Sequence, residues 1–288
     1  MKIALLTDGL FPDSIGGIQK HSHLLVKYFS KNKIYVDVYY VKNNPNPKIK
    51  YEEYKLDFVN FFEFKMPSTF YFPGHYLYNS YRLSKLYYRK LNLKSYDFIY
   101  AQGLTSWYFL KKNPYDLNLI SNLHGLNAYQ AVADKFELLK HFLHKIPCKA
   151  IIKNSKYQIS LGGSLKDILI KNGAKRSSIL TIPNAIESSW ISKGMPKKNT
   201  DVLKFVFIGR YQRTKGLKEI LKVVRKLISK YTFEFHFIGE IPENNKVINN
   251  NFIYHGIIKN SEKIRSILID SDILVCPSYS EGMPTVIL

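Results

Sequence analysis

The stretch VLKFVFIGRYQRTKGLKEIL, residues 202–221, decides the fold. It opens with apolar and β-branched residues, which predict a buried strand ending at Gly209. Residues 215–230 then have the apolar spacing of a helix. Loops that join a strand to a helix lie at the carboxyl edge of a parallel sheet, where such folds bind their ligands. Arg210 and Lys215 lie in this loop, and cations before a helix suit a phosphate group.

The same alternation of strand and helix extends along the chain. Further short apolar strands are predicted at residues 2–7, 34–41, 97–102, 117–124, 148–155, 177–184, 233–239, 252–256 and 272–276. Helical spacing recurs at residues 18–32, 164–174 and 262–270. Short apolar strands that alternate with helices are typical of an α/β fold whose parallel sheet is covered on both faces.

A polar segment without periodicity interrupts this pattern, so we predict two α/β units in tandem. The predicted boundaries are an N-terminal domain of residues 1–190, a linker of residues 191–200 and a C-terminal domain of residues 201–288. A domain of this kind typically has roughly 150 residues. The second domain is shorter than that, and we expect it to be incomplete.

The composition limits the partners. Against 22 Asp and Glu stand 43 Lys and Arg, which gives a formal net charge of +21. Such a field favours anionic partners, among them nucleic acid, acidic lipids and phosphorylated small molecules. A biased genome explains the lysine excess equally well. The basic residues are spread out and no nucleic-acid-binding motif is present, so no nucleic-acid partner is expected.

The cysteines and the apolar runs indicate the compartment. Cys148 and Cys276 lie far apart and form no CxxC motif, so neither a disulfide framework nor a zinc site is predicted. The N-terminus MKIALLTDGL is too short in apolar residues for a signal peptide. No apolar run approaches the ~18 residues of a membrane-spanning helix. We therefore expect a cytoplasmic protein, with any membrane contact made peripherally at the inner face.

Several further motifs follow predicted strands. They are Gly16 and Gly17 in FPDSIGGIQKH, His124 in SNLHGLNAY, Asn184 in IPNAIE, Gly239 and Glu240 in HFIGEIP, and Glu281 and Gly282 in PSYSEG. Glycines in such loops allow a ligand to approach the backbone closely. Each motif also has a plain alternative, namely a turn, a solvated loop or a structural histidine.

Taken in order along the chain, these motifs resemble glycosyltransferase family 4, the retaining nucleotide-sugar transferases of the GT-B fold. The resemblance covers nearly the whole chain and is strongest from Val202 onward. It implies two Rossmann-like, doubly wound domains that face each other across a cleft. The N-terminal domain would bind the acceptor and the C-terminal domain the sugar nucleotide.

The resemblance also implies roles for individual residues. Arg210 and Lys215 would clamp the donor diphosphate, and Gly17 would lie against the same region or the acceptor. His124 would contact the transferred sugar and Glu281 its hydroxyl groups, which makes them the catalytic pair. The other cleft positions would be Gly16, Asn184, Gly239, Glu240 and Gly282. No Asp-x-Asp metal motif is present, so we expect no metal or other cofactor beside the nucleoside-diphosphate sugar donor.

The expected reaction moves a sugar from this donor to a glycan or lipid-linked acceptor with retention, in the synthesis of a cell-surface polysaccharide or glycoconjugate. Two positions depart from the family pattern: Ala185 stands where Gly is common, and the second Glu of the family would follow Leu288. We therefore expect the sequence to be a truncated form of a longer enzyme. The alternative is a non-catalytic subunit that binds the sugar nucleotide. An epimerase of the same fold should carry different catalytic acids.

Residues 66–90 mix aromatic and basic residues. If residues 76–91 form a helix, Arg82, Lys85 and Arg89 share one of its faces. This pattern is typical of a helix that lies in an anionic membrane interface. It is also typical of an ordinary amphipathic helix at a protein surface, which the sequence alone favours.

Overall fold

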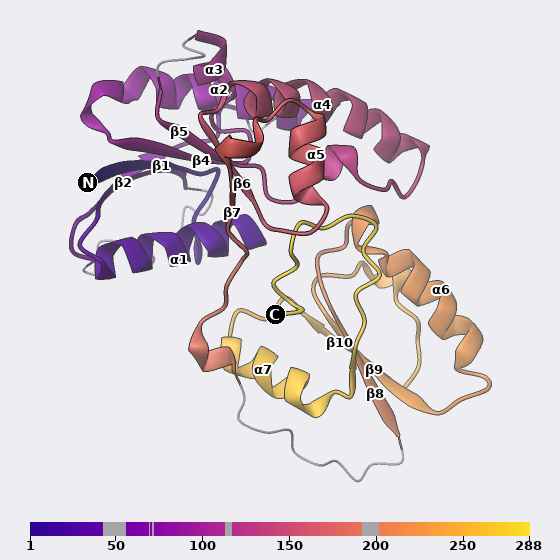
Figure 1. Ribbon diagram of the computed structural model, residues 1–288. Coiled ribbons are helices and arrows are strands. Elements are labelled where there is room, and N and C mark those ends of the chain that lie inside the picture. Colours follow the sequence, from indigo (N-terminus) through magenta and orange to yellow (C-terminus); the bar gives the residue numbers. More distant parts are fainter. Residues whose placement is uncertain (43–55, 69, 71, 113–116, 192–201) are drawn as a thin grey trace. The chain divides into compact units, whose positions relative to one another are not determined.

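The computed structural model describes residues 1–42, 56–68, 70, 72–112, 117–191 and 202–288 (Figure 1). Contacts between residues divide the chain into two compact units. Unit 1 comprises residues 1–129 and 139–184, and unit 2 comprises residues 130–138 and 185–288. The predicted linker of residues 191–200 falls almost wholly outside the described residues.

Unit 1 is built on a seven-stranded sheet in the order β3-β2-β1-β4-β5-β6-β7, and every pair in it is parallel. The strands are β1 (Lys2–Leu6), β2 (Tyr35–Val41), β3 (Val59–Phe64), β4 (Phe98–Gln102), β5 (Leu119–Asn122), β6 (Tyr157–Ser160) and β7 (Ile179–Thr181). This order is that of a doubly wound sheet, because the chain winds outward from β1 in one direction and from β4 in the other.

The helices of unit 1 follow from this winding. They are α1 (Gly17–Lys31), α2 (His75–Lys90), α3 (Trp107–Lys112), α4 (Lys135–Asn154), of which the first residues belong to unit 2, and α5 (Leu165–Lys171). In Figure 1, α1 lies on one face of the sheet and α2, α3 and α4 on the other. Right-handed crossovers require this, since connections that run in opposite directions along a sheet place their helices on opposite faces.

The core of unit 1 explains why the central strands were recognisable. The central strands bury nearly all their residues, as expected for a sheet covered on both faces. Tyr87 of α2 is fully buried, and its hydroxyl donates to the carbonyl of Thr7 over 2.8 Å. This bond satisfies the one polar atom of a large buried ring and ties α2 to the end of β1.

One predicted strand is wrong. The apolar run at residues 148–155 lies in α4 except for its last residue, and no strand forms there. Cys148, Ile151 and Ile152 are buried at a spacing of three and four residues, which is the spacing of one helix face. A short apolar run fits a buried helix as well as a buried strand, so the run alone misled the prediction.

Unit 2 has a four-stranded parallel sheet in the order β10-β9-β8-β11. Its strands are β8 (Leu203–Ile208), β9 (Phe233–Ile238), β10 (Phe252–Gly256) and the short β11 (Ile273–Leu274), and its helices are α6 (Leu217–Leu227) and α7 (Ser261–Asp270). In Figure 1, α6 and α7 flank this sheet from opposite sides. Short 3-10 turns occur in the chain at η2 (Leu93–Ser95), η3 (Asn127–Tyr129), η4 (Arg176–Ser178), η5 (Ser188–Trp190), η6 (Arg213–Lys215) and η7 (Glu243–Asn245).

Aromatic rings fill the core of unit 2. Phe207, Phe235 and Phe237 are buried with the inner face of α6, and the rings of Phe235 and Phe237 stack with centroids 4.4 Å apart. Stacked and edge-on rings bury large areas and favour defined packing. The predicted α/β class with parallel sheets is confirmed in both units.

Candidate active site

In unit 1 the order of the strands reverses between β1 and β4, and the loops that follow these two strands lie at this switch point. In open α/β sheets this switch point forms the crevice that binds ligands. The two glycines predicted there differ. A Cβ atom on Gly16 would lie 2.2 Å from Oε1 of Gln19, whose amide nitrogen donates to Asp8 over 2.9 Å. A Cβ atom on Gly17 would meet no atom within 4 Å. Local packing therefore accounts for Gly16 and leaves open space beside Gly17, at the start of α1.

His124 follows β5 at the same carboxyl edge. Its φ of 57° puts it in the left-handed region, which is unusual for a residue with a side chain. Its backbone N–H donates to Oδ1 of Asn122 over 2.9 Å. Its ring atom Nε2 lies 2.7 Å from Oε1 of Gln102, at the end of β4. In the tautomer that pairs with this oxygen, Nε2 carries the ring hydrogen and Nδ1 is the acceptor nitrogen.

The environment of His124 keeps its ring neutral. Burial, together with the neighbouring His21, lowers the pKa of His124 to about 3. Burial also lowers the pKa of His21 to about 4, and the two rings meet edge to face with centroids 5.3 Å apart. At neutral pH His124 can therefore accept or donate a hydrogen bond, but it is not a cation.

In unit 2, two glycines allow the loops that follow β8, β9 and β11 to approach each other closely. A Cβ atom on Gly239, after β9, would lie 2.0 Å from the carbonyl oxygen of Gly209, after β8. A Cβ atom on Gly216, at the start of α6, would lie 2.2 Å from the carbonyl oxygen of Pro277, after β11. Both glycines also have positive φ, of 133° and 70°. Only glycine permits so close a backbone approach with this geometry.

The structure pairs two of the predicted site residues directly. The ammonium group of Lys215, in η6, forms an ion pair with the carboxylate of Glu281, in the loop after β11, and both side chains are partly buried. Arg210 lies in the same loop as Lys215 and is exposed. A lysine ammonium has three donors. Lys215 can therefore hold Glu281 and still donate to a phosphate oxygen.

A residue that the sequence analysis missed fixes the backbone of Glu281. The side-chain amide of Gln130 donates to the carbonyl of Glu281 over 2.7 Å, and its oxygen accepts the N–H of Glu281 over 3.2 Å. Such a two-point contact sets the position of Glu281 along the loop. A single glutamine in an irregular segment gives no sequence signal, so only the structure identifies it.

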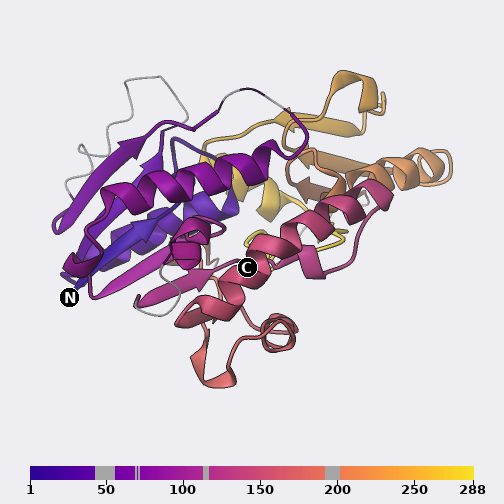
Figure 2. The same ribbon diagram turned by 90° about the horizontal axis from the view of Figure 1, so that it is seen from above.

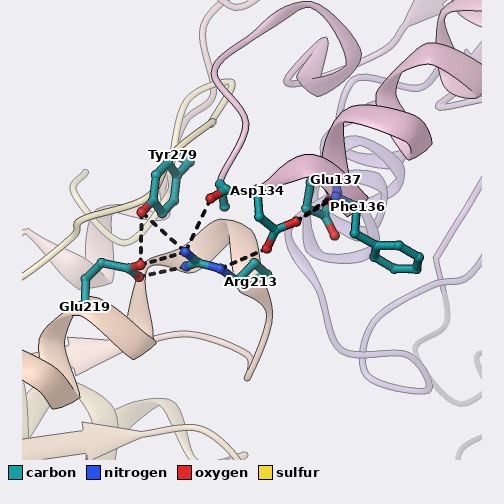
Figure 3. Close-up of polar contacts among 7 residues, drawn as sticks. Asp134, Phe136, Glu137, Arg213, Glu219 and Tyr279 are labelled. Atoms are coloured by element: carbon teal, nitrogen blue, oxygen red, sulfur yellow. Dashed lines mark hydrogen bonds and ion pairs between the residues drawn. The ribbon is translucent and has the colours of Figure 1, made fainter.

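Arg213 is the second residue that the sequence analysis missed, and Figure 3 shows its surroundings. Its guanidinium group forms a two-point pair with the carboxylate of Glu219 on α6, at 2.7 and 2.8 Å. Its Nε atom lies 3.2 Å from the carboxylate of Asp134. Tyr279 donates to Glu219 over 2.9 Å and lies with its ring 5.1 Å beneath the guanidinium carbon of Arg213.

These contacts join three parts of unit 2. Asp134 also accepts the N–H groups of Phe136 and Glu137 over 3.1 and 3.0 Å, and so caps the start of α4. Burial raises the pKa of Glu219, but hydrogen bonds from Arg213 and Tyr279 outweigh this and hold it below its usual range. Arg213 thus serves to connect residues 130–138, η6 and the loop after β11.

The remaining predicted residues lie at strand ends. Asn184 follows β7 in unit 1, while Glu240 follows β9 and Gly282 follows Glu281 in unit 2. Asn184 and Gly282 are partly buried, while Glu240 is exposed. In the part of the chain that the structure describes, no group of three His, Cys, Asp or Glu side chains is placed to hold a metal ion. Among these residues there is also no helix with the length and apolar character needed to cross a membrane.

Comparison with known proteins identifies the family. Residues 15–190 match the model described as Glycosyltransferase Family 4, and residues 203–288 match the model described as Glycosyl transferases group 1. An uncharacterized glycosyltransferase of Methanocaldococcus jannaschii is 25% identical over 301 aligned positions, which cover 96% of this chain and 75% of that protein. The Bacillus subtilis protein TuaC, named for teichuronic acid biosynthesis, is 34% identical over 83 residues, 29% of this chain and 21% of that protein.

Solved structures agree on the fold. Sucrose-phosphate synthase of Thermosynechococcus elongatus superposes with a TM-score of 0.76 at 16% identity, over 99% of this chain and 77% of that one. HepE of Anabaena, solved in complex with UDP and glucose, gives a TM-score of 0.61 at 13% identity, over 100% of this chain and 77% of that one. The fold is the GT-B fold of two Rossmann-like domains. With the family model matched over residues 15–190, the chain belongs to glycosyltransferase family 4.

Proposed function

We propose that this glycosyltransferase moves a sugar from a nucleoside-diphosphate sugar to a hydroxyl group of a glycan or lipid-linked acceptor, with retention of the anomeric configuration. The observation that carries the proposal is the ion pair of Lys215 with Glu281. It sets a cation and a carboxylate together at the carboxyl edge of a parallel sheet, where such folds bind ligands. The similarity to HepE, whose structure holds UDP and glucose, supports a donor of this class.

The transfer step needs positive charge at the leaving group. When the bond between the anomeric carbon and the phosphate oxygen breaks, the electron pair leaves with the diphosphate. The acceptor oxygen bonds to the same face of the sugar and gives its proton to the leaving phosphate oxygen. Arg210 and Lys215 would stabilise the departing diphosphate, and loss of one such group costs about 100-fold or more in rate.

The other predicted residues would hold the sugar. The carboxylate of Glu281 accepts hydrogen bonds from hydroxyl groups, and its backbone is already fixed by Gln130. His124, kept neutral by burial, would contact the transferred sugar through a hydrogen bond and not through a charge. A neutral ring suits this role because it does not compete with Arg210 and Lys215 for the diphosphate.

The acceptor class rests on different support. The matched Bacillus subtilis protein is named for teichuronic acid biosynthesis, so we propose a role in the synthesis of a cell-surface polysaccharide or glycoconjugate. The formal net charge of +21 favours an anionic surface near the acceptor. We therefore propose a cytoplasmic enzyme that acts peripherally at the inner face of a membrane.

A donor screen tests the proposal. The protein is incubated with UDP-, GDP- and ADP-sugars and a mixture of glycan and lipid-linked acceptors, and release of the nucleoside diphosphate is measured with and without EDTA. We expect release that depends on the acceptor and is insensitive to EDTA, and a product whose anomeric proton coupling matches that of the donor. Tight binding of a donor without release would instead favour a non-catalytic subunit. An inverted product would contradict retention.

A further inference from the structure

A buried glutamine at the end of β4 contacts the ring of His124. Gln102 is the last residue of β4 and is 1% exposed. Its side-chain oxygen lies 2.7 Å from Nε2 of His124, whereas its amide nitrogen has no hydrogen-bond partner among the described residues. A buried amide without a partner is costly, because it loses its hydrogen bonds to water. An apolar residue would serve the fold better here, so the role of Gln102 lies in its contact with His124.

The alternation of β4 places Gln102 on the face of the sheet that carries α1. Ile99 and Ala101 belong to the core cluster that contains Tyr87 of α2. Helices α2 and α4 lie over that face, as the view from above shows (Figure 2). Because side chains alternate along a strand, Tyr100 and Gln102 lie on the opposite face, where α1 is found (Figure 1).

Several contacts hold His124 in one orientation. Oδ1 of Asn122 accepts the backbone N–H of His124, and the amide of Asn122 donates to the hydroxyl of Tyr100 over 3.2 Å. His21 of α1 meets the ring edge to face, and Gln102 pairs with its Nε2. The φ of 57° at His124 is unfavourable for a residue with a side chain. Backbone strain of this kind persists where surrounding contacts fix it, and such places cluster at functional sites.

The bond to Gln102 decides which ring nitrogen is left for a ligand. A neutral imidazole has one donor and one acceptor nitrogen, and the partner of one nitrogen sets the tautomer. When Nε2 of His124 donates to the oxygen of Gln102, Nδ1 is the acceptor. The hydrogen bonds of His124 within the described part of the chain leave Nδ1 unused. A ligand group that pairs with this nitrogen must therefore supply a hydrogen.

An amide suits this contact better than a carboxylate. Burial, together with the neighbouring His21, lowers the pKa of His124 to about 3. A glutamate at position 102 would place a negative charge beside Nε2 and would favour the charged ring. Both ring nitrogens would then be donors, and Nδ1 could no longer accept. Gln102 accepts the same hydrogen bond without a charge, so the ring stays neutral.

We propose that Gln102 is a positioning residue for sugar transfer, which holds His124 in the tautomer whose Nδ1 accepts a hydrogen bond from a hydroxyl group of the transferred sugar. This inference rests on the function proposed above and adds a rule of specificity to it. A sugar with a free hydroxyl group at that position pairs with Nδ1, whereas a deoxy, fluoro or keto sugar supplies no hydrogen there. Sites built to bond a hydroxyl group reject analogues that lack it.

Nitrogen NMR of isotope-labelled histidines tests the tautomer without any sugar donor. The signals of His124 are identified by their loss in His124→Asn. At pH 7.5 the wild type should show Nε2 protonated and Nδ1 unprotonated. In Gln102→Glu the ring should become doubly protonated at a higher pH than in the wild type, because a carboxylate favours the charged form. A wild-type ring protonated at Nδ1 would overturn the proposal, whether or not the protein transfers sugar.

The pH profile of kcat/KM separates positioning from structural support. Between pH 8 and pH 5 the wild-type profile should show no titration of His124, since its ring stays neutral throughout. In Gln102→Glu, kcat/KM should fall by roughly tenfold as the pH drops through the pKa that NMR gives for this ring, because one hydrogen bond to the sugar is lost. It should return toward the wild-type value as the pH rises. A structural defect would lower it equally at every pH.

Ser121→Ala is the matched control, since it removes from β5, the strand beside β4, a buried hydroxyl that has no partner among the described residues. Its NMR signals and its pH profile should be those of the wild type. A loss in Gln102→Glu that does not depend on pH, or an unchanged profile when NMR shows a protonated ring, would overturn the proposal. Failure of every donor in the screen would refute sugar transfer and the role of His124 in it, while NMR alone would decide whether Gln102 sets the tautomer.

Discussion

The ammonium group of Lys215 forms an ion pair with Glu281, and we predict that it also binds the donor diphosphate. Replacing it by methionine keeps the length of the side chain and removes the charge. Hydrogen bonds to charged groups contribute about 1.5–3 kcal/mol, so Lys215→Met should bind a nucleoside diphosphate roughly 10- to 100-fold more weakly. Calorimetric titration with UDP, GDP and ADP measures this.

Lys222→Met is the matched control for this experiment, since Lys222 is exposed on α6 in the same unit. It should bind with the affinity of the wild type. If Lys215→Met also bound all three nucleotides as tightly as the wild type, the assignment of Lys215 to the diphosphate would be wrong.

Gln130 acts on the site through the backbone of Glu281. In Gln130→Ala both hydrogen bonds are lost, each contributing about 0.5–1.5 kcal/mol. We expect kcat/KM to fall by about tenfold, with a smaller change in nucleoside-diphosphate affinity, because the sugar and not the diphosphate is the predicted partner of Glu281. Steady-state kinetics alongside UDP titration separates the two quantities. An equal loss in both would show that Gln130 supports the loop as a whole.

The paired histidines give unit 1 a predictable pH dependence. The pKa of His21 is about 4 in the folded protein and about 6.5 when unfolded. Between these values the unfolded chain binds more protons, so the free energy of unfolding is highest above pH 6.5 and falls as the pH is lowered toward 4. The loss for His21 alone reaches about 2 kcal/mol at pH 5.

Urea unfolding of the wild type and of His21→Gln at pH 7.5 and pH 5 isolates this effect. Every other titrating group is common to both proteins, so the difference in slope belongs to His21 together with its effect on the pKa of its neighbour His124. The variant should lose less stability on acidification. Equal losses would mean that His21 is not held neutral in the folded state.

Residue identities in the site were predictable only where a motif carried them. Lys215 and Glu281 were identified separately, and the structure brings them into contact. Gln130 and Arg213 were missed, since their roles depend on partners far away in sequence, such as Asp134 and Tyr279. A contact between distant residues leaves no periodicity or spacing to detect.

At the scale of elements, we expect alanine substitutions of the glycines at the start of α6 and of α1 to affect stability differently. Gly216 has a φ of 70° and has Pro277 against it, so Gly216→Ala should displace the loop after β11 and lower the stability of unit 2 by roughly 1–3 kcal/mol. Gly17 lies in α1 with open space beside it, so Gly17→Ala should unfold like the wild type.

Sugar-transfer activity then distinguishes a glycine that the fold requires from a glycine that leaves space for a ligand. Gly17→Ala should reduce transfer while its thermal unfolding is unchanged, because its new methyl group would occupy space predicted for the donor or acceptor. Unchanged activity would leave Gly17 as a plain helix start. An unaltered unfolding temperature in Gly216→Ala would contradict the close approach of Gly216 and Pro277.

The prediction of elements succeeded where periodicity was simple. The largely apolar β1 and β2 were identified within a residue or two. The strand β6, with the sequence YQIS, was missed because it buries polar residues: the amide of Gln158 donates to the carbonyls of Ile152 and Ser155, each over 2.8 Å. These hydrogen bonds, to the last turn of α4 and the residue after it, satisfy the buried amide, and the composition of the strand does not reveal them.

At the scale of the whole molecule, each unit has its own core. One cluster of buried side chains draws only on unit 1, from Ala4 to Ile151, and another only on unit 2, from Phe207 to Phe252. The cores differ in character, because the second is filled largely by phenylalanine rings. Separate cores predict that a ligand bound by one unit stabilises that unit first.

Hydrogen exchange with UDP tests this division. At a ligand concentration of about 100 times Kd, binding stabilises the unit that binds it by about 2.7 kcal/mol. We expect slower amide exchange in unit 2, most strongly at residues 209–217 and 277–282, where Lys215 and Glu281 lie. The amides at the start of α1 report on Gly17 independently. Protection confined to unit 1 would contradict the assignment of the donor to unit 2, because stabilisation follows the unit that holds the ligand.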